Sequence, residues 1–149
     1  MSDYALAWST PLIAAVAALI TLRQWATARQ AHRLSMFDRR WSVYKGTKHF
    51  VAEPVIRGSI SDEMLRSFLV ATEGAEWLFD KAMGRFLRKD LYENGLKLQQ
   101  LTTLTAGKVY ATDDERQQER DEVARLKSWF NDQLNGLDDR FRPFMHVKH

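Results

Sequence analysis

The chain has 149 residues, with 22 Lys and Arg against 19 Asp and Glu, and a formal net charge of +3. It contains no cysteine, which excludes disulfides and cysteine-based metal or nucleophile chemistry. With 28% charged residues, only 3 Pro and only 7 Gly, the composition is typical of one helical globular domain and unlike that of a disordered chain.

The first predicted element is an apolar stretch of 19 residues from Tyr4 to Leu22, which contains no charged residue. A helix of this length, at about 1.5 Å per residue, nearly crosses a hydrocarbon core of about 30 Å. Trp8 and Trp25 flank it, as aromatic residues often do at membrane interfaces. We therefore predict a transmembrane anchor at residues 1–24. The alternatives are a buried or oligomer-core helix and a cleaved signal peptide, and the latter is disfavoured because the positive charge follows the apolar stretch.

Positive charge is concentrated directly after this stretch. Residues 23–48 contain seven Lys and Arg and one Asp, a net charge of +6, whereas residues 49–149 contain 15 Lys and Arg and 17 Asp and Glu, a net charge of −2. By the positive-inside rule, this distribution predicts a single-pass protein of the cell inner membrane, with its N-terminus outside and its C-terminus in the cytoplasm. Anionic lipid headgroups are then an expected partner, at about 1 kcal/mol per basic residue near the surface.

Five arginines of this segment are candidates for contact with a lipid phosphate or another anionic ligand, because a guanidinium binds phosphate in a bidentate way. They are Arg23, Arg29, Arg33, Arg39 and Arg40. For Arg39 and Arg40 we favour the alternative that they form an ion pair that fixes a neighbouring helix. Nucleic acid is not an expected partner, because no recognised nucleic-acid-binding motif accompanies the charges.

Residues 25–52 are predicted to form a basic stalk that continues into the first helix of a bundle. Two rows of apolar residues at helical spacing mark a broad face on this helix: Leu34, Phe37, Trp41, Tyr44 and Val51, and beside them Met36, Val43 and Phe50. We expect the helix to end near Ala52, because Pro54 disfavours helical backbone at Glu53.

The remaining residues, 53–149, predict the rest of a helical domain. One helix starts with Ser61 as its N-cap and continues to Phe79, and the next starts with Asp80 and ends near Gly107. A capping-box pattern of Thr112 with Glu115 starts the last long helix. The predicted fold class is therefore all-α, with an N-terminal transmembrane helix that continues into a cytoplasmic bundle of about four helices. The residues expected in the core include Phe37, Trp41, Phe68, Phe86 and Phe130.

Three segments resemble one family of proteins. The sequence MFDRRWSVY at Met36–Tyr44 is similar to the LFDRR-x-x-VY pattern of small bacterial membrane proteins, which share an N-terminal span and an uncharacterised helical cytoplasmic domain. Ile60–Asp80 resembles their second helix and the turn after it, and FRPFM at Phe141–Met145 resembles their closing element. The resemblance covers most of the chain and departs from the pattern at Met36, where Leu is commoner. It implies the same organisation of span and helical domain, and it assigns no functional residue.

No sequence pattern predicts an enzyme, a metal site or a cofactor. The four histidines form neither an H-x-x-x-H nor an H-E-x-x-H pattern, and the sequence contains no Gly-rich phosphate loop and no G-x-S-x-G. Three weaker alternatives are His146 with His149 as metal ligands, the acidic residues between 113 and 122 as a cation site, and Glu73 with Glu76 as an acid–base pair. Solvated side chains and surface ion pairs explain these residues better.

The sequence therefore predicts a membrane-anchored scaffold or interaction module that forms homo-oligomers, with a further protein partner left open. Ala14 and Ala18 support self-association, because small residues four apart let transmembrane helices approach closely. The alternative is an oligomeric membrane effector, of the stress or antiphage type, whose cytoplasmic domain responds to a small anionic ligand.

Overall fold

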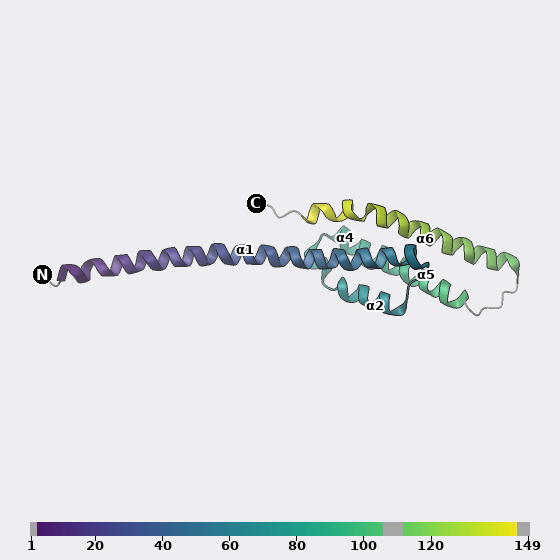
Figure 1. Cartoon of the computed structure of the whole chain (residues 1–149), viewed down its shortest axis with the longest axis horizontal. Coiled ribbons are helices and arrows are strands. Elements are labelled where there is room, and N and C mark those ends of the chain that lie inside the picture. The colour runs from purple at the N-terminus through teal and green to yellow at the C-terminus, as the bar shows by residue number, and fades with distance from the viewer. Residues whose placement is uncertain (1–2, 106–111, 146–149) are drawn as a thin grey trace. The chain divides into compact units, whose positions relative to one another are not determined.

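The computed structural model describes the backbone of residues 3–105 and 112–145, and the side chains of residues 18–25, 34–103 and 112–145. Within these ranges every regular element is helical, so the all-α prediction is confirmed. In chain order (Figure 1) the elements are α1 (Asp3–Arg57), α2 (Asp62–Ala71), α3 (Ala75–Leu78), α4 (Lys81–Arg85), the π-helix η1 (Phe86–Leu91), α5 (Tyr92–Thr105), α6 (Asp113–Phe141) and the 3₁₀-helix η2 (Arg142–Phe144). The chain divides into two compact units, Met1–Phe37 and Asp38–His149.

The first unit contains the predicted membrane span. Its described side chains include five large apolar residues that are more than half exposed: Leu19, Ile20, Leu22, Trp25 and Leu34. Taking only the residues described with their side chains, no helix is both long and apolar enough to pass through a membrane. Residues 1–17, which hold Ala14 and most of the predicted span, lie outside the side chains described, while Ala18 is exposed.

The second unit is built around one face of α1, but this face is only partly the predicted one. Val43, Thr47, Phe50 and Pro54 are buried at spacings of four, three and four residues. Trp41, which we expected in the core, is 42% exposed and stacks on Tyr44 with ring centroids 5.1 Å apart. That prediction is wrong because the buried side of α1 is centred on Val43 and Phe50; of the other row, Val51 is also buried, whereas Trp41 lies toward the edge.

The expected end of this helix near Ala52 is also wrong, because α1 continues to Arg57. Pro54 is fully buried, and its carbonyl accepts a hydrogen bond from the N–H of Gly58 at 3.0 Å. Gly58 has φ +78°, the left-handed backbone that commonly ends a helix. Burial of the proline ring in the core compensates for the helical hydrogen bond that its nitrogen lacks, so the helix ends one turn later.

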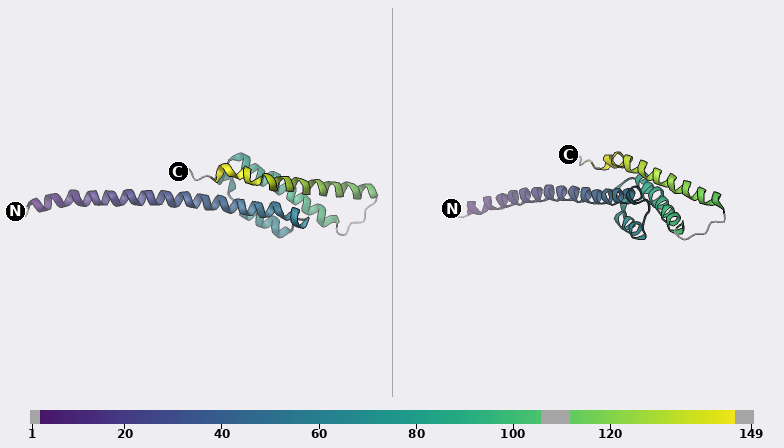
Figure 2. Two further views of the ribbon diagram at one scale, coloured as in Figure 1. Left: turned by 45° about the horizontal axis from the view of Figure 1, so that its top comes forward. Right: turned by 45° about the vertical axis from the view of Figure 1, so that its right-hand side comes forward.

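The centre of the core is an aromatic cluster around Phe50. Its ring stacks on Phe68 of α2 at 4.1 Å between centroids and meets Phe130 of α6 edge-on at 6.1 Å. Gly95 of α5 lies against the same ring, so closely that an added methyl group would overlap it. Phe86, Phe68 and Phe130 are buried as predicted, while Phe37 is half-buried. In the views of Figure 2, α5 lies alongside α6, with which it shares direct contacts.

The three predicted helix starts are confirmed. Ser61, Asp80 and Thr112 are N-caps, and each side chain accepts a hydrogen bond from the backbone N–H three residues later. The predicted continuous helix to Phe79 is wrong, because α2 ends at Ala71 and α3 is separate. The π-helix was not predicted. Its wider turn allows Phe86, Leu87 and Leu91 all to be buried. Gly107, the expected end of the following helix, lies outside the described residues.

Candidate binding site at the α2–α3 turn

The turn that joins α2 to α3 is formed by Thr72, Glu73 and Gly74. Thr72 ends α2, since its hydroxyl and its backbone N–H both donate to the carbonyl of Phe68, at 2.8 and 3.0 Å. Gly74 has φ +72°, a left-handed conformation that costs other residues free energy, and it starts α3 as N-cap. The sequence therefore breaks the helix here, and two hollows share Glu73 and Gly74 of this turn.

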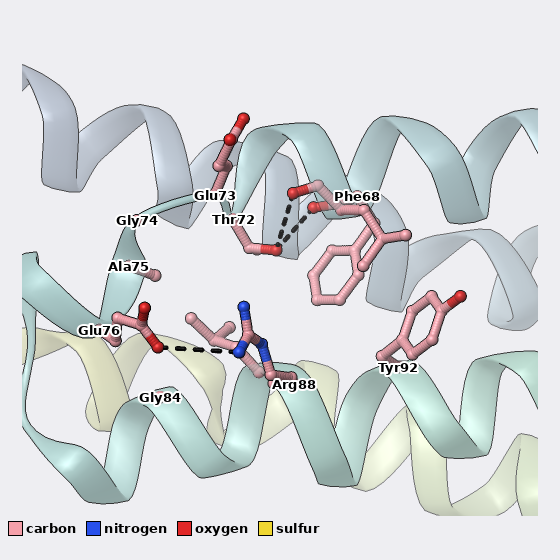
Figure 3. A pocket seen from close by; sticks show the side chains of 11 residues that line it. Phe68, Thr72, Glu73, Gly74, Ala75, Glu76, Gly84, Arg88 and Tyr92 are labelled. Carbon is pink, nitrogen blue, oxygen red and sulfur yellow. Dashed lines mark hydrogen bonds and ion pairs between the residues drawn. The ribbon is translucent and has the colours of Figure 1, made fainter.

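The smaller hollow is a cavity of about 100 Å³ between the turn and the π-helix (Figure 3). Phe68, Leu87 and Tyr92 are among the residues that line it. Figure 3 shows the guanidinium of Arg88 and the carboxylate of Glu76 pointing toward each other, with Nη1 and Oε2 3.8 Å apart. Because drug-sized ligands occupy about 300 Å³ or more, this cavity has room only for a few water molecules or one small ion.

The two carboxylates considered as an acid–base pair, Glu73 and Glu76, both line this cavity. They do not act on a common point, because Glu76 pairs with Arg88 while Glu73 points away from that guanidinium in Figure 3. Both side chains are exposed to solvent. The interpretation as surface ion pairs is confirmed for Glu76, whereas Glu73 takes part in no ion pair among the described residues.

The larger hollow is an open groove of about 490 Å³ between α1 and the segment from Val70 to Leu78. Buried Val43 lies among its lining residues, while Val70 and Trp77 are 72% and 83% exposed. Arg39 contributes to the groove from α1, and Glu73 from the turn. Large aromatic residues are seldom this exposed on a free surface and are enriched at protein interfaces, so the groove is the clearest binding surface of the second unit.

Sequence periodicity missed Trp77, because this residue lies off the apolar stripe that predicts the buried face of α2 and α3. A usable signal exists in the neighbouring residues: Gly74 follows polar Glu73 and precedes the aromatic pair Trp77 and Phe79 by a few positions. In the structure Phe79 is buried and Trp77 is exposed.

Arg40, one of the predicted anion contacts, is half-buried and already bound within the domain. Its Nε donates to the carbonyl of Leu78 and its Nη1 to the carbonyl of Phe144, both at 3.0 Å. Arg40 thus ties α1 to the end of α3 and to η2, as cationic side chains commonly do at helix C-termini. The favoured interpretation, an ion pair that fixes a neighbouring helix, is wrong for both arginines among the described residues: Arg40 fixes the helices through backbone carbonyls, and Arg39 takes part in no ion pair.

The other predicted arginines are not brought together with Arg40. Arg39 is exposed at the groove, and Arg23 is exposed in the first unit. The side chains of Arg29 and Arg33 lie outside those that the structure describes, as do His146 and His149. Among the described residues, no group of three or more His, Cys, Asp or Glu is placed to hold a metal ion.

Two exposed polar clusters perturb the pKa values of their carboxylates. The hydroxyl of Tyr44 donates to Asp138 Oδ1 at 2.6 Å and Lys48 Nζ lies 3.2 Å from the same oxygen, so Tyr44 first and Lys48 second lower the pKa of Asp138. Arg125 and Lys97 together lower the pKa of Glu122 to about 2. The first cluster joins α1 to α6 and the second joins α5 to α6, so both act as links between helices.

Comparison of the chain with protein-family models, with curated proteins and with solved structures found no match.

Proposed function

We propose that the chain is a helical interaction module, anchored in the inner membrane by its N-terminal segment, whose cytoplasmic domain associates with other copies of itself. The observation that carries this proposal is the exposure of Leu19, Ile20 and Leu22 on one helix. At about 100° per residue, these side chains spread over about 160° of the helix circumference. Lipid covers a helix from all sides, whereas a single packed partner covers a narrower stripe, so lipid is the environment that suits this segment best.

The charge distribution supports the same proposal. Residues 23–48 carry a net charge of +6, and Arg23, Arg29 and Arg33, which follow the apolar segment most closely in the sequence, suit anionic headgroups directly after a span. The small pair Ala14 and Ala18 suits close packing between spans. Restriction to the membrane plane raises the effective concentration of the domains, so weak surfaces on them become sufficient for association.

Membrane fractionation and reporter fusions test the anchor. The full chain is expected in the membrane fraction after carbonate extraction, and Leu19→Lys with Ile20→Lys is expected to release it, because charged residues are costly in a span. Exposed Arg66 provides the control: Arg66→Glu leaves the fractionation unchanged. A reporter fused at Lys148 is expected to be active only when it is a cytoplasmic reporter. Recovery of the wild-type chain in the soluble fraction contradicts the proposal.

Crosslinking in membranes tests self-association. The wild-type chain is expected to give discrete species above the monomer, and Ala14→Leu with Ala18→Leu is expected to weaken them. A wild-type chain that stays monomeric at native expression contradicts the self-association.

A second candidate function, an oligomeric membrane effector that responds to a small anion, is favoured by one feature. Arg88 is exposed at a cavity of about 100 Å³ and is held by a single ion pair with Glu76. An inorganic anion such as phosphate can compete for that guanidinium. Titration of the full chain with inorganic phosphate, followed by the change in its oligomeric species, tests this function, with Arg88→Gln as the variant that abolishes the response.

A further inference from the structure

We propose that the groove formed by α1 and the α2–α3 turn docks against the same groove of a second copy of the chain, in a two-fold symmetric arrangement. This inference rests on the self-association proposed above and identifies the surface that the two copies share. The groove is an open hollow of about 490 Å³ that carries Arg39, Glu73, Val70 and Trp77.

The charges of the groove are complementary to themselves. Arg39 lies on one wall, on α1, and Glu73 lies on the other, at the turn. Within the described part of the chain, neither takes part in an ion pair. A two-fold axis that runs along the groove exchanges the two walls, so Arg39 of each copy faces Glu73 of the other. One cation and one carboxylate on opposite walls therefore form two ion pairs in a symmetric dimer.

The apolar residues of the groove require a cover that two copies supply. Val70 and Trp77 are 72% and 83% exposed, and a face-to-face arrangement places both pairs in the dimer interface. A tryptophan can bury about 150–250 Å². Two such residues and their neighbours fall short of the 1,200–2,000 Å² that stable soluble dimers bury. Association through this groove is therefore weak in solution and depends on the membrane anchor, which raises the local concentration.

A lipid surface is the other occupant that an exposed tryptophan with a nearby arginine suggests. Glu73 disfavours it, because a carboxylate on the rim of the groove is repelled by anionic headgroups while Arg39 is attracted. A second copy satisfies both charges, and a lipid surface satisfies one.

The full chain in membranes tests the proposal directly, because the absence of native cysteine lets one introduced cysteine report on one surface. Ser42→Cys places a thiol in the groove, and Ser128→Cys places one on exposed α6 as the control. With a bifunctional thiol reagent, Ser42→Cys is expected to give a crosslinked dimer and Ser128→Cys is not. Strong crosslinking of Ser128→Cys alone overturns the proposed surface.

Charge exchange then identifies the occupant. In the Ser42→Cys background, Arg39→Glu alone and Glu73→Arg alone are each expected to lower dimer formation about tenfold, because each places like charges opposite one another twice. Co-expression of the two variants with different tags is expected to restore mixed dimers to near the wild-type yield, since every facing pair is again opposite in charge. The exposed controls Arg66→Glu and Glu93→Arg are expected to change nothing.

The outcomes separate this inference from the function on which it rests. If single variants dimerise as the wild type does, or the mixed pair is not restored, the groove is not the shared surface, although higher species held by the span still support self-association. If Trp77→Ala lowers binding to vesicles of anionic lipid, and Ser42→Cys gives no crosslinked dimer either alone or with the other substitutions, the groove faces lipid and the proposal fails. If the wild-type chain forms no oligomer of any kind, the proposed function itself fails.

Discussion

Truncation of the central aromatic residue of the core should destabilise the domain far more than truncation of the larger aromatic residue nine positions earlier. Phe50 is fully buried, stacks on Phe68 at 4.1 Å and meets Phe130 at 6.1 Å, whereas Trp41 is 42% exposed. Phe50→Ala leaves a cavity that these rings cannot close, at a cost of about 3–5 kcal/mol. Trp41→Ala leaves no cavity and loses mainly its stacking on Tyr44 and partial burial, which is about 1–2 kcal/mol.

Thermal unfolding of the purified full chain, followed by helical circular dichroism, measures this difference. For a domain of this size, about 1 kcal/mol corresponds to about 4 °C, so Phe50→Ala should lower the melting temperature by about 12–20 °C and Trp41→Ala by about 4–8 °C. Urea midpoints provide an independent measurement of the same order. Equal destabilisation by the two variants, or a larger effect of Trp41→Ala, would refute the assignment of the buried face of α1.

Three further predictions follow from other contacts. Arg40→Gln should destabilise the closing helix η2 by about 1–3 kcal/mol, because the carbonyls of Leu78 and Phe144 lose their donors. Faster amide hydrogen exchange in η2 measures this loss, and Arg40→Lys should recover little of the lost stability. The pKa of Glu122 is lowered from its usual 4.5 to about 2, so the stability that this group contributes is present above pH 4.5 and is lost as the pH falls toward 2; Glu122→Gln should flatten that part of the acid unfolding curve. Gly95→Ala should cost about 1–3 kcal/mol through overlap with Phe50, whereas Gly136→Ala, with open space around it in α6, should stabilise by about 0.5–1 kcal/mol in the same thermal assay.

The helix starts were predictable because their determinants are local. Ser61, Asp80 and Thr112 each precede a helix, and each side chain accepts a hydrogen bond from a backbone N–H group in the first turn of that helix. The acidic first turn of α6 further stabilises the helix start at Thr112. These hydrogen bonds join residues three positions apart, so the rest of the chain has little influence on them. Local chemistry of this kind survives folding unchanged, which is why it can be read from the sequence.

The sequence predicts the buried face of α1 only in part, because its two apolar rows lie side by side on the helix: Val43, Phe50 and Val51 are buried, whereas Trp41 is exposed. Residues elsewhere in the chain contribute to this selection: Gly95 leaves a space on α5 that the ring of Phe50 approaches most closely, with Ile60 beside it. That complementarity joins positions 45 residues apart and leaves no periodic pattern in the sequence. The π-helix has the same origin, since burial of Phe86, Leu87 and Leu91 together depends on helices that surround them.

The groove was likewise absent from the sequence-based prediction, although its residues are ordinary in type. The sequence predicts Arg39 as a candidate anion contact because of its charge and, as a weaker alternative, Glu73 as half of an acid–base pair with Glu76. The groove instead brings Arg39, Glu73 and Trp77 together, although Arg39 and Glu73 lie more than thirty residues apart in the sequence. The helix break at Gly74 leaves Trp77 exposed beside α1. The prediction of one helix that continues to Phe79 does not include this break and therefore misses the groove.

In the membrane-anchored dimer proposed above, self-association and anchoring place opposite electrostatic demands on residues 23–48. Each copy brings a charge of +6 over this segment, which opposes the approach of a second copy, whereas the groove contributes two attractive pairs of Arg39 with Glu73. Salt at physiological concentration screens exposed charges beyond about 8 Å, so it weakens the distant repulsion more than the pairs in direct contact. Anionic headgroups neutralise the basic segment without competing for Glu73, since like charges repel. The proposal therefore predicts that the dimer forms more readily in anionic than in neutral bilayers, because anionic headgroups reduce the repulsion between the basic segments and leave the pairs of Arg39 with Glu73 intact.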